Sequence, residues 1–450
     1  MKRKIYDKLL EWKKRAHGET ALMIEGARRV GKSYIVEAFA KQEYESYIII
    51  DFNNTNKQIK ELFVNTLYDL DTLFMYLGLY AGVKLKERSS LIVFDEVQCF
   101  PPARAAIKYL VKDGRYDYIE TGSLVSIRKN VKGITIPSEE EPIQMNPMDF
   151  EEFLWAMGED TLMDLIRIQY ERQQPMGQAM HRKAMAWLRQ YLIVGGMPQA
   201  VLKYSETRDF DEVDRQKRII LNLYRNDISQ YADRQETRVT QIFDGIPSQL
   251  QRHEKRFRLA LLKKDARYRD YDTAFFWLSD AKIVNICYNC TEPNIGYKLT
   301  RDGNTLKCYM ADTGLLLSHS FDENGIMSAQ LYKKLMTDKL EINGGMMMEN
   351  LVAQMLVAAG HNLYFFSSYS KDNTLERMEI DFLVMKPSIT SRHNVSPIEV
   401  KSGKNYTLDS LLKFKEKYGS MSYKPFVIHT ADFKVLKGVT FLPLYMSPLL

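Results

Sequence analysis

The sequence Gly-x-x-x-x-Gly-Lys-Ser at residues 26–33 constrains this chain more than any other stretch. An apolar run, residues 21–24, comes directly before it, and a helical pattern follows. A strand, a tight glycine-containing turn and a helix N-terminus together bind phosphate, because backbone N–H groups and the helix dipole both favour an anion. We expect Lys32 to reach the β- and γ-phosphates of a nucleotide and Ser33 to ligate Mg²⁺.

The nucleotide-binding residues predicted from this motif are the loop and the first residues of the helix. They are Gly26, Ala27, Arg28, Arg29, Val30, Gly31, Lys32, Ser33 and Tyr34. The alternative is a glycine-rich turn that carries Lys-Ser by chance. The strand before the motif and the helix after it favour phosphate binding, so ATP and Mg²⁺ are the expected cofactors.

Apolar runs alternate with helical patterns over the first expected domain, residues 1–154. The expected strands are residues 21–25, 47–52, 91–95 and 116–121, and the expected helices are residues 6–15, 33–41, 57–68 and 103–112. Continuous apolar strands that alternate with helices predict an α/β fold with a parallel sheet covered by helices on both faces. In such sheets a ligand binds at the carboxyl ends of the strands.

Polar residues follow two of these strands where the ligand is expected. The apolar residues 91–94 lead into Asp95 and Glu96, and a later strand ends near Thr121 and Ser123. Phosphoryl transfer needs a metal anchor and a positioned nucleophile, so we assign Asp95 to Mg²⁺ and Glu96 to the attacking water. Thr121 and Ser123 are candidates to sense the γ-phosphate, with a simple turn or helix cap as the alternative.

Residues 26–33, 94–98 and 121–123 together resemble the AAA-type ATPases of prokaryotic genomes, with a Walker A loop followed by Walker B acids. The stretch Pro-Met-Asp-Phe-Glu-Glu-Phe-Leu at residues 147–154 is similar to a signature in one branch of that group. In that branch the ATPase core precedes a C-terminal domain of poorly known function. The resemblance implies a P-loop ATPase in which Glu96 is the catalytic acid.

The same resemblance implies a homo-oligomer, because hydrolysis in such ATPases can need an arginine from a neighbouring subunit. Location alone gives three candidates for that residue in this chain, which are Arg104, Arg115 and Arg128.

Composition limits the cellular compartments in which this protein is expected. The chain has 450 residues, only four cysteines and a basic, amphipathic start in place of a signal-peptide segment. Four cysteines in a chain of this length do not make a disulfide framework. No apolar run approaches the ~20 residues that span a bilayer. A cytoplasmic protein without membrane contact is expected.

The positive charge is concentrated in one segment. The whole chain has a formal net charge of +6, whereas residues 215–269 contain 14 Lys and Arg against 6 Asp and Glu, a balance of +8. A localised basic segment is typical of a nucleic-acid contact, so DNA is the predicted partner. A solvated helical face is the alternative.

Two further regions are expected before the C-terminal domain. Residues 155–234 have helical patterns and are expected to form a helical lid or linker. Residues 235–322 combine three expected helices, at 240–251, 257–264 and 271–280, with a strand pair, which is the outline of a winged helix. The alternative for this outline is a module that packs against partner subunits.

The expected C-terminal domain, residues 323–450, carries a second set of charged residues. Glu399 and Lys401 alternate along one strand and therefore face the same side, and Asp381 lies on a strand expected to pair with it. Two carboxylates suit Mg²⁺, and a nearby lysine can activate water. The alternative is ionic decoration of a β-hairpin.

With Glu349 on the preceding helix, this set resembles the PD-(D/E)xK nucleases, which have a restriction-endonuclease-like α/β fold. The resemblance implies metal ligation by Glu349, Asp381 and Glu399, and catalysis by Asp381, Glu399 and Lys401. The leading hypothesis is therefore an ATPase that couples nucleotide state to DNA binding and to metal-dependent DNA cleavage. The alternatives are an ATPase switch acting on protein partners, with an inactive nuclease-like module, and a nucleotide-binding scaffold with little turnover.

Overall fold

The computed structural model describes most of the chain, and its contacts divide that chain into two compact units. The described residues are 1–124, 135–252, 254–293, 297–321, 332, 344–369, 373, 376–385, 395–403, 405–419 and 424–450. The first unit comprises Met1–Asn146 with Asp280–Lys282, and the second comprises Pro147–Ser279 with Ile283–Leu450. No helix in the described part of the chain has both the length and the apolar character that crossing a membrane requires.

The first unit is built on one five-stranded sheet in which every pairing is parallel. The strand order is β2-β3-β4-β1-β5. The strands are β1 (Ala21–Glu25), β2 (Ser46–Asp51), β3 (Ser90–Asp95), β4 (Asp117–Gly122) and β5 (Glu140–Gln144). Four of these lie within one or two residues of the strands expected from the sequence. Strand β5 was not expected, because its Glu-Glu-Pro-Ile-Gln sequence has little apolar character.

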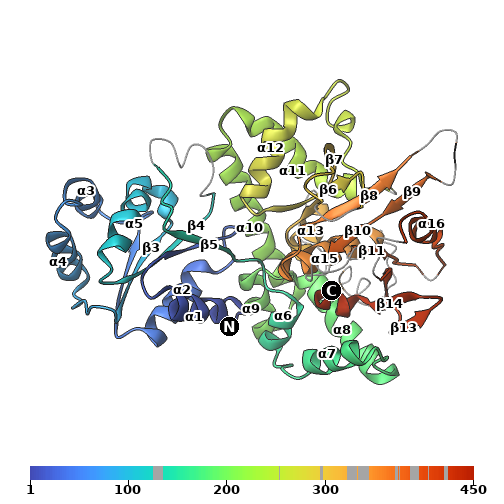
Figure 1. Cartoon of the computed structure of the whole chain (residues 1–450), viewed down its shortest axis with the longest axis horizontal. Helices are drawn as coiled ribbons and strands as arrows, with labels where there is room; N and C mark the ends of the chain where they lie inside the picture. Colours follow the sequence, from blue (N-terminus) through green and yellow to red (C-terminus); the bar gives the residue numbers. More distant parts are fainter. Residues whose placement is uncertain are drawn as a thin grey trace. The chain divides into compact units, whose positions relative to one another are not determined.

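Helices cover both faces of this sheet, which confirms the fold expected for the first domain. In Figure 1 the unit runs from blue to teal. Its helices are α1 (Ile5–Ala16), α2 (Lys32–Glu43), α3 (Lys57–Asn65), α4 (Leu70–Ala81) and α5 (Pro101–Asp113). Helices α1 and α2 share one apolar core with the sheet, and helices α3, α4 and α5 share the other. Short helix η1 (Val97–Cys99) follows β3 directly.

The second unit is rich in helices along its N-terminal half. They are α6 (Phe150–Met157), α7 (Leu162–Arg172), α8 (Gln178–Val194), α9 (Pro198–Thr207), α10 (Phe210–Tyr231), η2 (Asp233–Gln235), α11 (Glu236–Leu250) and α12 (Tyr268–Asp280). The helical character expected for residues 155–234 is present. Helices α7 and α8 are separate because Gln173 adopts a left-handed backbone, with φ of 53°, and Pro175 follows it.

The helix expected at residues 257–264 is wrong. Only one 3-10 turn, η3 (Leu259–Leu261), forms there. The Phe257 N–H donates to the Leu306 carbonyl over 2.8 Å. The Arg258 N–H donates to Gln249 Oε1 over 3.0 Å. These tertiary bonds hold residues 257 and 258 away from a helix and override the local preference.

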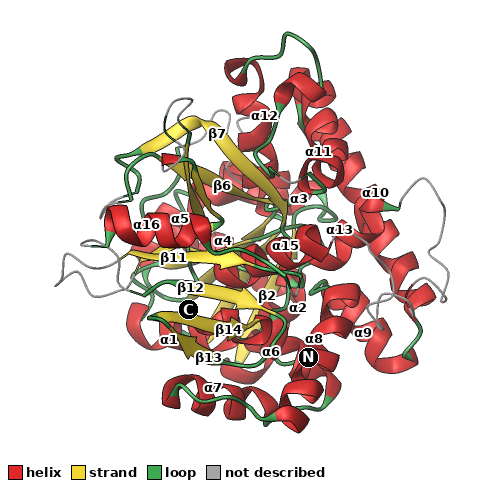
Figure 2. Ribbon diagram, turned by 90° about the vertical axis from the view of Figure 1, so that its right-hand side faces the viewer, coloured by secondary structure: helices red, strands yellow, loops and turns green. Residues whose placement is uncertain are grey.

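The remaining elements of the second unit form two sheets, seen beside each other in Figure 2. One sheet has the order β7-β6-β8-β9, from β6 (Val284–Cys290), β7 (Arg301–Met310), β8 (Tyr364–Ser368) and β9 (Met378–Ile380). The other has the order β10-β11-β12-β14-β13, from β10 (Phe382–Met385), β11 (Val395–Val400), β12 (Phe426–His429), β13 (Lys434–Leu436) and β14 (Val439–Pro443). Helices α13 (Thr313–Ser320), α15 (Gly344–Ala358), α16 (Asp409–Tyr418) and η6 (Leu444–Leu449) complete the unit.

One sheet crosses the domain boundary expected at residue 322. Strands β6 and β7 form an antiparallel pair, and β6 also pairs in parallel with β8. The hairpin is thus continuous with the strands of the expected C-terminal domain. Helix α16 closes a shared core, since Leu411 and Phe414 pack with Phe366, Ile380 and Val427.

Candidate functional site

Strands β1, β3 and β4 of the first unit end at the same edge of the sheet, and each is followed directly by predicted site residues. The loop after β1 is closely packed. A Cβ atom on Gly26 would lie 2.5 Å from the Met145 carbonyl oxygen, so a side chain there does not fit. Gly31 has φ of 98°, a conformation that glycine adopts readily and that starts α2. The local geometry thus explains both glycines of the motif.

The polar side chains of this edge are already joined by hydrogen bonds. Lys32 is buried, and its Nζ donates to the Gly26 carbonyl over 2.9 Å and to the Ala27 carbonyl over 3.1 Å. Ser33 Oγ donates to Asp95 Oδ1 over 3.0 Å, and Thr121 Oγ1 donates to the same oxygen. The hydroxyl and carboxylate oxygens of Ser33 and Asp95 are the ligand types that Mg²⁺ prefers, so this edge fits Mg²⁺ with a nucleotide.

The predicted catalytic acid is held in a defined position. Glu96 is a non-glycine residue with φ of 53°, a conformation that costs about 1–2 kcal/mol. Its backbone N–H donates to Thr121 Oγ1 over 3.4 Å. Gln98 Nε2 donates to Glu96 Oε2 and, over 3.4 Å, to Ser123 Oγ. Gln98 therefore links the ends of β3 and β4.

Two supporting residues were missed by the sequence analysis. Gln98 lies within the motif at residues 94–98, where its glutamine amide was the available signal. Arg3 gave no signal, because it is one of several basic residues near the start. In the structure Arg3 is buried, and its guanidinium donates to the Val30 carbonyl over 3.0 Å and to the Asn146 carbonyl over 2.7 Å. Arg3 therefore connects the phosphate loop to Asn146, the last residue of the segment Met1–Asn146.

The candidate arginines are engaged within their own chain where the structure describes them. Arg104 is buried and forms a two-point ion pair with Glu140, at 2.9 and 2.7 Å. Arg115 pairs with Asp113 at 2.7 Å and with Asp71 at 2.6 Å. Arg128 lies outside the described residues. Arg104 and Arg115 thus both form ion pairs within their own chain.

The four C-terminal site residues lie in one neighbourhood of the second unit. Glu399 is buried and pairs with Lys401 at 2.7 Å, as alternation along a strand predicts. Asp381 Oδ2 accepts the N–H of Val400, the residue between them, over 2.9 Å. Glu349, on α15, shares a cation with Asp381. The sequence analysis did not identify that cation.

The shared cation is Lys307, on β7. Its side chain is 1% exposed, and its Nζ lies 3.2 Å from Glu349 Oε1, 3.4 Å from Asp381 Oδ1 and 3.1 Å from Glu379 Oε1. Lys255 adds a second ion pair, 2.5 Å from Glu349 Oε2. A lone lysine in a strand forms no recognisable motif, so only the tertiary structure assigns Lys307 to this cluster.

Burial and neighbouring charges perturb the acids of this cluster in opposite directions. Burial raises the pKa of Glu399 to about 7, against the smaller effect of Lys401. Burial and the negative charge of Glu349 also raise the pKa of Asp381. Burial would raise the pKa of Glu349 as well, but Lys307 and Lys255 outweigh it and lower that pKa to about 2. Glu349 is thus the firmly ionised member.

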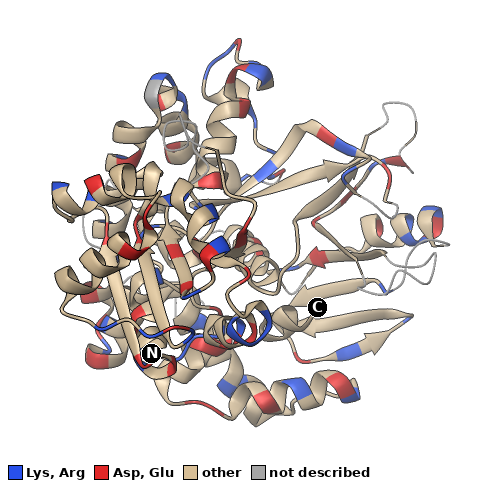
Figure 3. Cartoon of the chain, turned by 60° about the vertical axis from the view of Figure 1, so that its left-hand side comes forward, with Lys and Arg blue, Asp and Glu red and all other residues tan. Residues whose placement is uncertain are grey.

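The basic segment at residues 215–269 is only partly a surface feature. Lys217 is buried and donates to the Ile193 carbonyl over 2.8 Å, and Lys255 points into the carboxylate cluster. The turn between α11 and α12, at the top of Figures 1 and 3, carries several of the exposed charges. Within the described residues, four of its exposed cations make no ion pair, namely Arg252, Lys263, Lys264 and Arg267.

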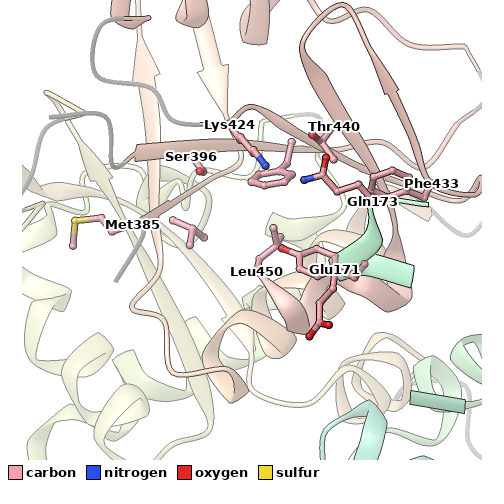
Figure 4. A pocket seen from close by; sticks show the side chains of 11 residues that line it. Glu171, Gln173, Met385, Ser396, Lys424, Phe433, Thr440 and Leu450 are labelled. Atoms are coloured by element: carbon pink, nitrogen blue, oxygen red, sulfur yellow. The ribbon is translucent and has the colours of Figure 1, made fainter. Parts of the chain in front are cut away.

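The second unit also contains a cavity of about 290 Å³ between the end of α7 and the C-terminal sheet, shown in Figure 4. Its lining is mixed, with apolar side chains such as Phe433 beside Lys424 and Glu171. No site residue predicted from the sequence lines it. Its single cation and single carboxylate indicate no particular chemistry.

Comparison with known proteins identifies a named family in the first part of the chain only. The family described as "AAA domain" matches residues 18–154. Two families described as domains of unknown function, DUF8612 and DUF4143, match residues 185–324 and 344–446. No curated protein matches this sequence.

Several solved structures match over much of the chain at low identity. The Walker-type ATPase paby2304 of Pyrococcus abyssi is 15% identical with a TM-score of 0.41, and the match covers 71% of this chain and 95% of that one. A Drosophila ORC structure bound to DNA is 13% identical with a TM-score of 0.26, covering 72% and 96%. A DNA replication initiation factor is 12% identical with a TM-score of 0.22, covering 63% and 80%.

TM-scores this low do not indicate a shared overall fold, so function must be derived from the residues of this chain and from the family match. The phosphate loop, the parallel five-stranded sheet with helices on both faces and the AAA-domain match agree with one another. Residues 18–154 therefore fit a P-loop, AAA-type ATPase core that binds ATP.

Proposed function

We propose that this chain hydrolyses ATP at the edge formed by the ends of β1, β3 and β4, and that nucleotide state controls binding of DNA by the second unit. The observation that carries the first part is the hydrogen-bonded group of Ser33, Asp95 and Thr121 beside the buried Lys32. This group supports the proposal because a hydroxyl and a carboxylate suit Mg²⁺ and a lysine suits phosphate oxygens.

The roles of the residues follow from these positions. When nucleotide binds, the Lys32 ammonium group gives up its hydrogen bonds to the Gly26 and Ala27 carbonyls and donates to phosphate oxygens instead. Ser33 and Asp95 would hold Mg²⁺, which when bound would neutralise part of the phosphate charge. Glu96, positioned by its hydrogen bond with Gln98, orients the attacking water and accepts its proton.

The substitution Glu96→Gln tests this assignment. It removes the proton acceptor but keeps the loop, so ATP binding is expected to persist while turnover falls about 100-fold or more. Exposed Glu61→Gln, on α3, is the matched control and should leave both quantities unchanged. Unchanged turnover in Glu96→Gln would show that Glu96 has no catalytic role.

The DNA-binding part of the proposal is supported by the exposed cations between α11 and α12. When surface lysines and arginines bind DNA phosphates, they displace the counterions held there. The affinity for DNA therefore falls as the salt concentration rises. The double variant Lys263→Glu/Lys264→Glu is expected to weaken DNA binding and to reduce its salt slope by about 2. Lys415→Glu/Lys417→Glu, on exposed positions of α16, makes the same change in charge elsewhere. Equal losses in both variants would contradict a local interface.

The alternative is an ATPase switch that acts on protein partners. The first unit favours it through the exposed apolar surface of α3 and α4 with the turn between them. The six most exposed of these side chains are Val64, Tyr68, Met75, Tyr76, Leu79 and Tyr80. ATP turnover that DNA leaves unchanged at low salt would favour this alternative. Stimulation by DNA that disappears as salt rises would favour the DNA-linked function.

A further inference from the structure

Three carboxylates of the C-terminal cluster, from α15, β9 and the link between β9 and β10, meet around one buried ammonium group. Glu349 lies on α15, Glu379 lies on β9, and Asp381 lies between β9 and β10. Each has an oxygen within 3.1–3.4 Å of Lys307 Nζ. Because Lys307 is 1% exposed, this arrangement is an internal contact of the fold. A resident metal ion would have to use the same oxygens.

Further contacts within the chain engage oxygens of Glu349, Asp381 and Glu399. Tyr309 donates its hydroxyl hydrogen to Glu349 Oε1, and Lys255 lies 2.5 Å from Glu349 Oε2. Asp381 Oδ2 accepts the Val400 N–H, and Glu399 Oε2 faces Lys401 at 2.7 Å. Every oxygen named here already faces a hydrogen-bond donor or a cation of this chain.

The charges of the cluster are nearly balanced without any added ion. Its four carboxylates, Glu349, Glu379, Asp381 and Glu399, face three lysines, Lys255, Lys307 and Lys401. A divalent ion needs several oxygen ligands that are free to approach to about 2.0–2.6 Å. The Lys307 ammonium group lies between the three carboxylates, where a divalent ion would have to bind, and its positive charge repels such an ion. The residues therefore do not fit the metal that the nuclease resemblance implies.

We propose that Lys307, assisted by Lys255, is the permanent counter-ion of this cluster, which is a lysine-centred structural hub and takes no divalent metal. The hub joins α15 to the strands β7 and β9. Through Lys255 it also anchors the segment between α11 and α12. Metal-dependent cleavage by Asp381, Glu399 and Lys401 is accordingly not expected of this site.

Binding of Mn²⁺ to the nucleotide-free full chain tests the proposal without relying on activity. Titration followed by electron paramagnetic resonance should give the same bound fraction for the wild type and for Asp381→Asn, because no bound ion uses Asp381. One Mn²⁺ per chain that Asp381→Asn removes would overturn the proposal.

A pair of stability measurements tests the role of Lys307 directly. Lys307→Met leaves buried carboxylates without their counter-ion, and the Tm is expected to fall by about 5 °C or more. Adding Asp381→Asn to Lys307→Met removes one stranded charge, so the double variant should melt higher than Lys307→Met alone. An unchanged Tm in Lys307→Met, or a double variant that melts no higher, would overturn the proposal. If Lys307→Met does not fold, the Mn²⁺ comparison still decides.

Discussion

Among single residues of the ATPase unit, Glu120 has a strongly raised pKa. Its side chain is fully buried on β4, close to Glu140, which Arg104 holds. Burial first, and then the negative charge of Glu140, raise the pKa of Glu120 well above its usual range, although Arg104 acts in the opposite direction. Folding therefore favours the protonated form of Glu120.

This perturbation predicts a pH dependence of stability. Because the folded-state pKa of Glu120 is raised, its stabilising contribution is complete below the unfolded pKa of about 4.5 and is lost as pH rises toward the folded pKa. The slope for one such group does not exceed about 1.4 kcal/mol per pH unit. Glu120→Gln stays neutral and should flatten the curve of unfolding free energy against pH, measured by urea denaturation. Parallel curves for the two proteins would contradict this explanation.

Residue-scale features were predictable where neighbours in sequence are also neighbours in space. The phosphate loop is contiguous, so its motif specified residues 26–33 and their setting. Lys307 belongs to a cluster drawn from separate segments, and nothing near it in sequence marks it. Lys255 belongs to the basic segment expected to contact DNA, whereas in the structure it pairs with the buried Glu349. Local patterns do not encode which of several similar lysines becomes buried.

At the scale of elements, the signature at residues 147–154 has a structural explanation in α6. Asp149 Oδ1 accepts the Glu152 N–H over 2.9 Å, and Glu152 Oε2 accepts the Asp149 N–H over 3.1 Å, so the two form a capping box. Phe150 and Phe153 are fully buried. The acidic and aromatic positions of the signature thus begin a helix and attach it to the core.

The capping box of α6 is expected to contribute to the stability of the fold. Asp149→Ala leaves helix N–H groups without their acceptor and should lower the free energy of unfolding by about 1–2 kcal/mol. Asp164→Ala is the control, because Asp164 is exposed near the start of α7 and its ion pair with Arg167 lies at the surface. Equal effects of the two substitutions, measured by thermal or urea unfolding, would show that the cap is not stabilising.

Elements with a strong periodic pattern were predicted well, and those defined by tertiary contacts were not. Strands β1, β3 and β4 follow from their apolar runs. Strand β5 pairs with β1 despite its polar sequence. It lies at the edge of the sheet, has one neighbouring strand and is only partly buried, so polar side chains are tolerated there. The helix expected at residues 257–264 is prevented because the Arg258 N–H donates to the Gln249 side chain and the Phe257 N–H donates to the Leu306 carbonyl. Those partners are distant or on another element, so no local pattern reveals them.

For the whole molecule, the account combines an ATPase core with a second unit that contains exposed cations and a lysine-centred hub. The sequence analysis predicted the first unit because one motif and alternating strands are sufficient for it. It divided residues 235–450 into a winged helix and a nuclease-like domain, whereas strands β6 and β8 join both regions in one sheet. Pairing between strands so far apart in sequence depends on contacts that short patterns do not contain.

The central claim is that the phosphate loop binds and hydrolyses ATP, and steady-state ATP turnover in Lys32→Ala tests it most directly. The substitution removes the cation beside the loop carbonyls, so turnover should fall about 100-fold or more. Lys41→Ala removes an exposed lysine from the same helix, one paired only with Glu37, and should retain wild-type turnover. Turnover in Lys32→Ala equal to that of Lys41→Ala would contradict the account.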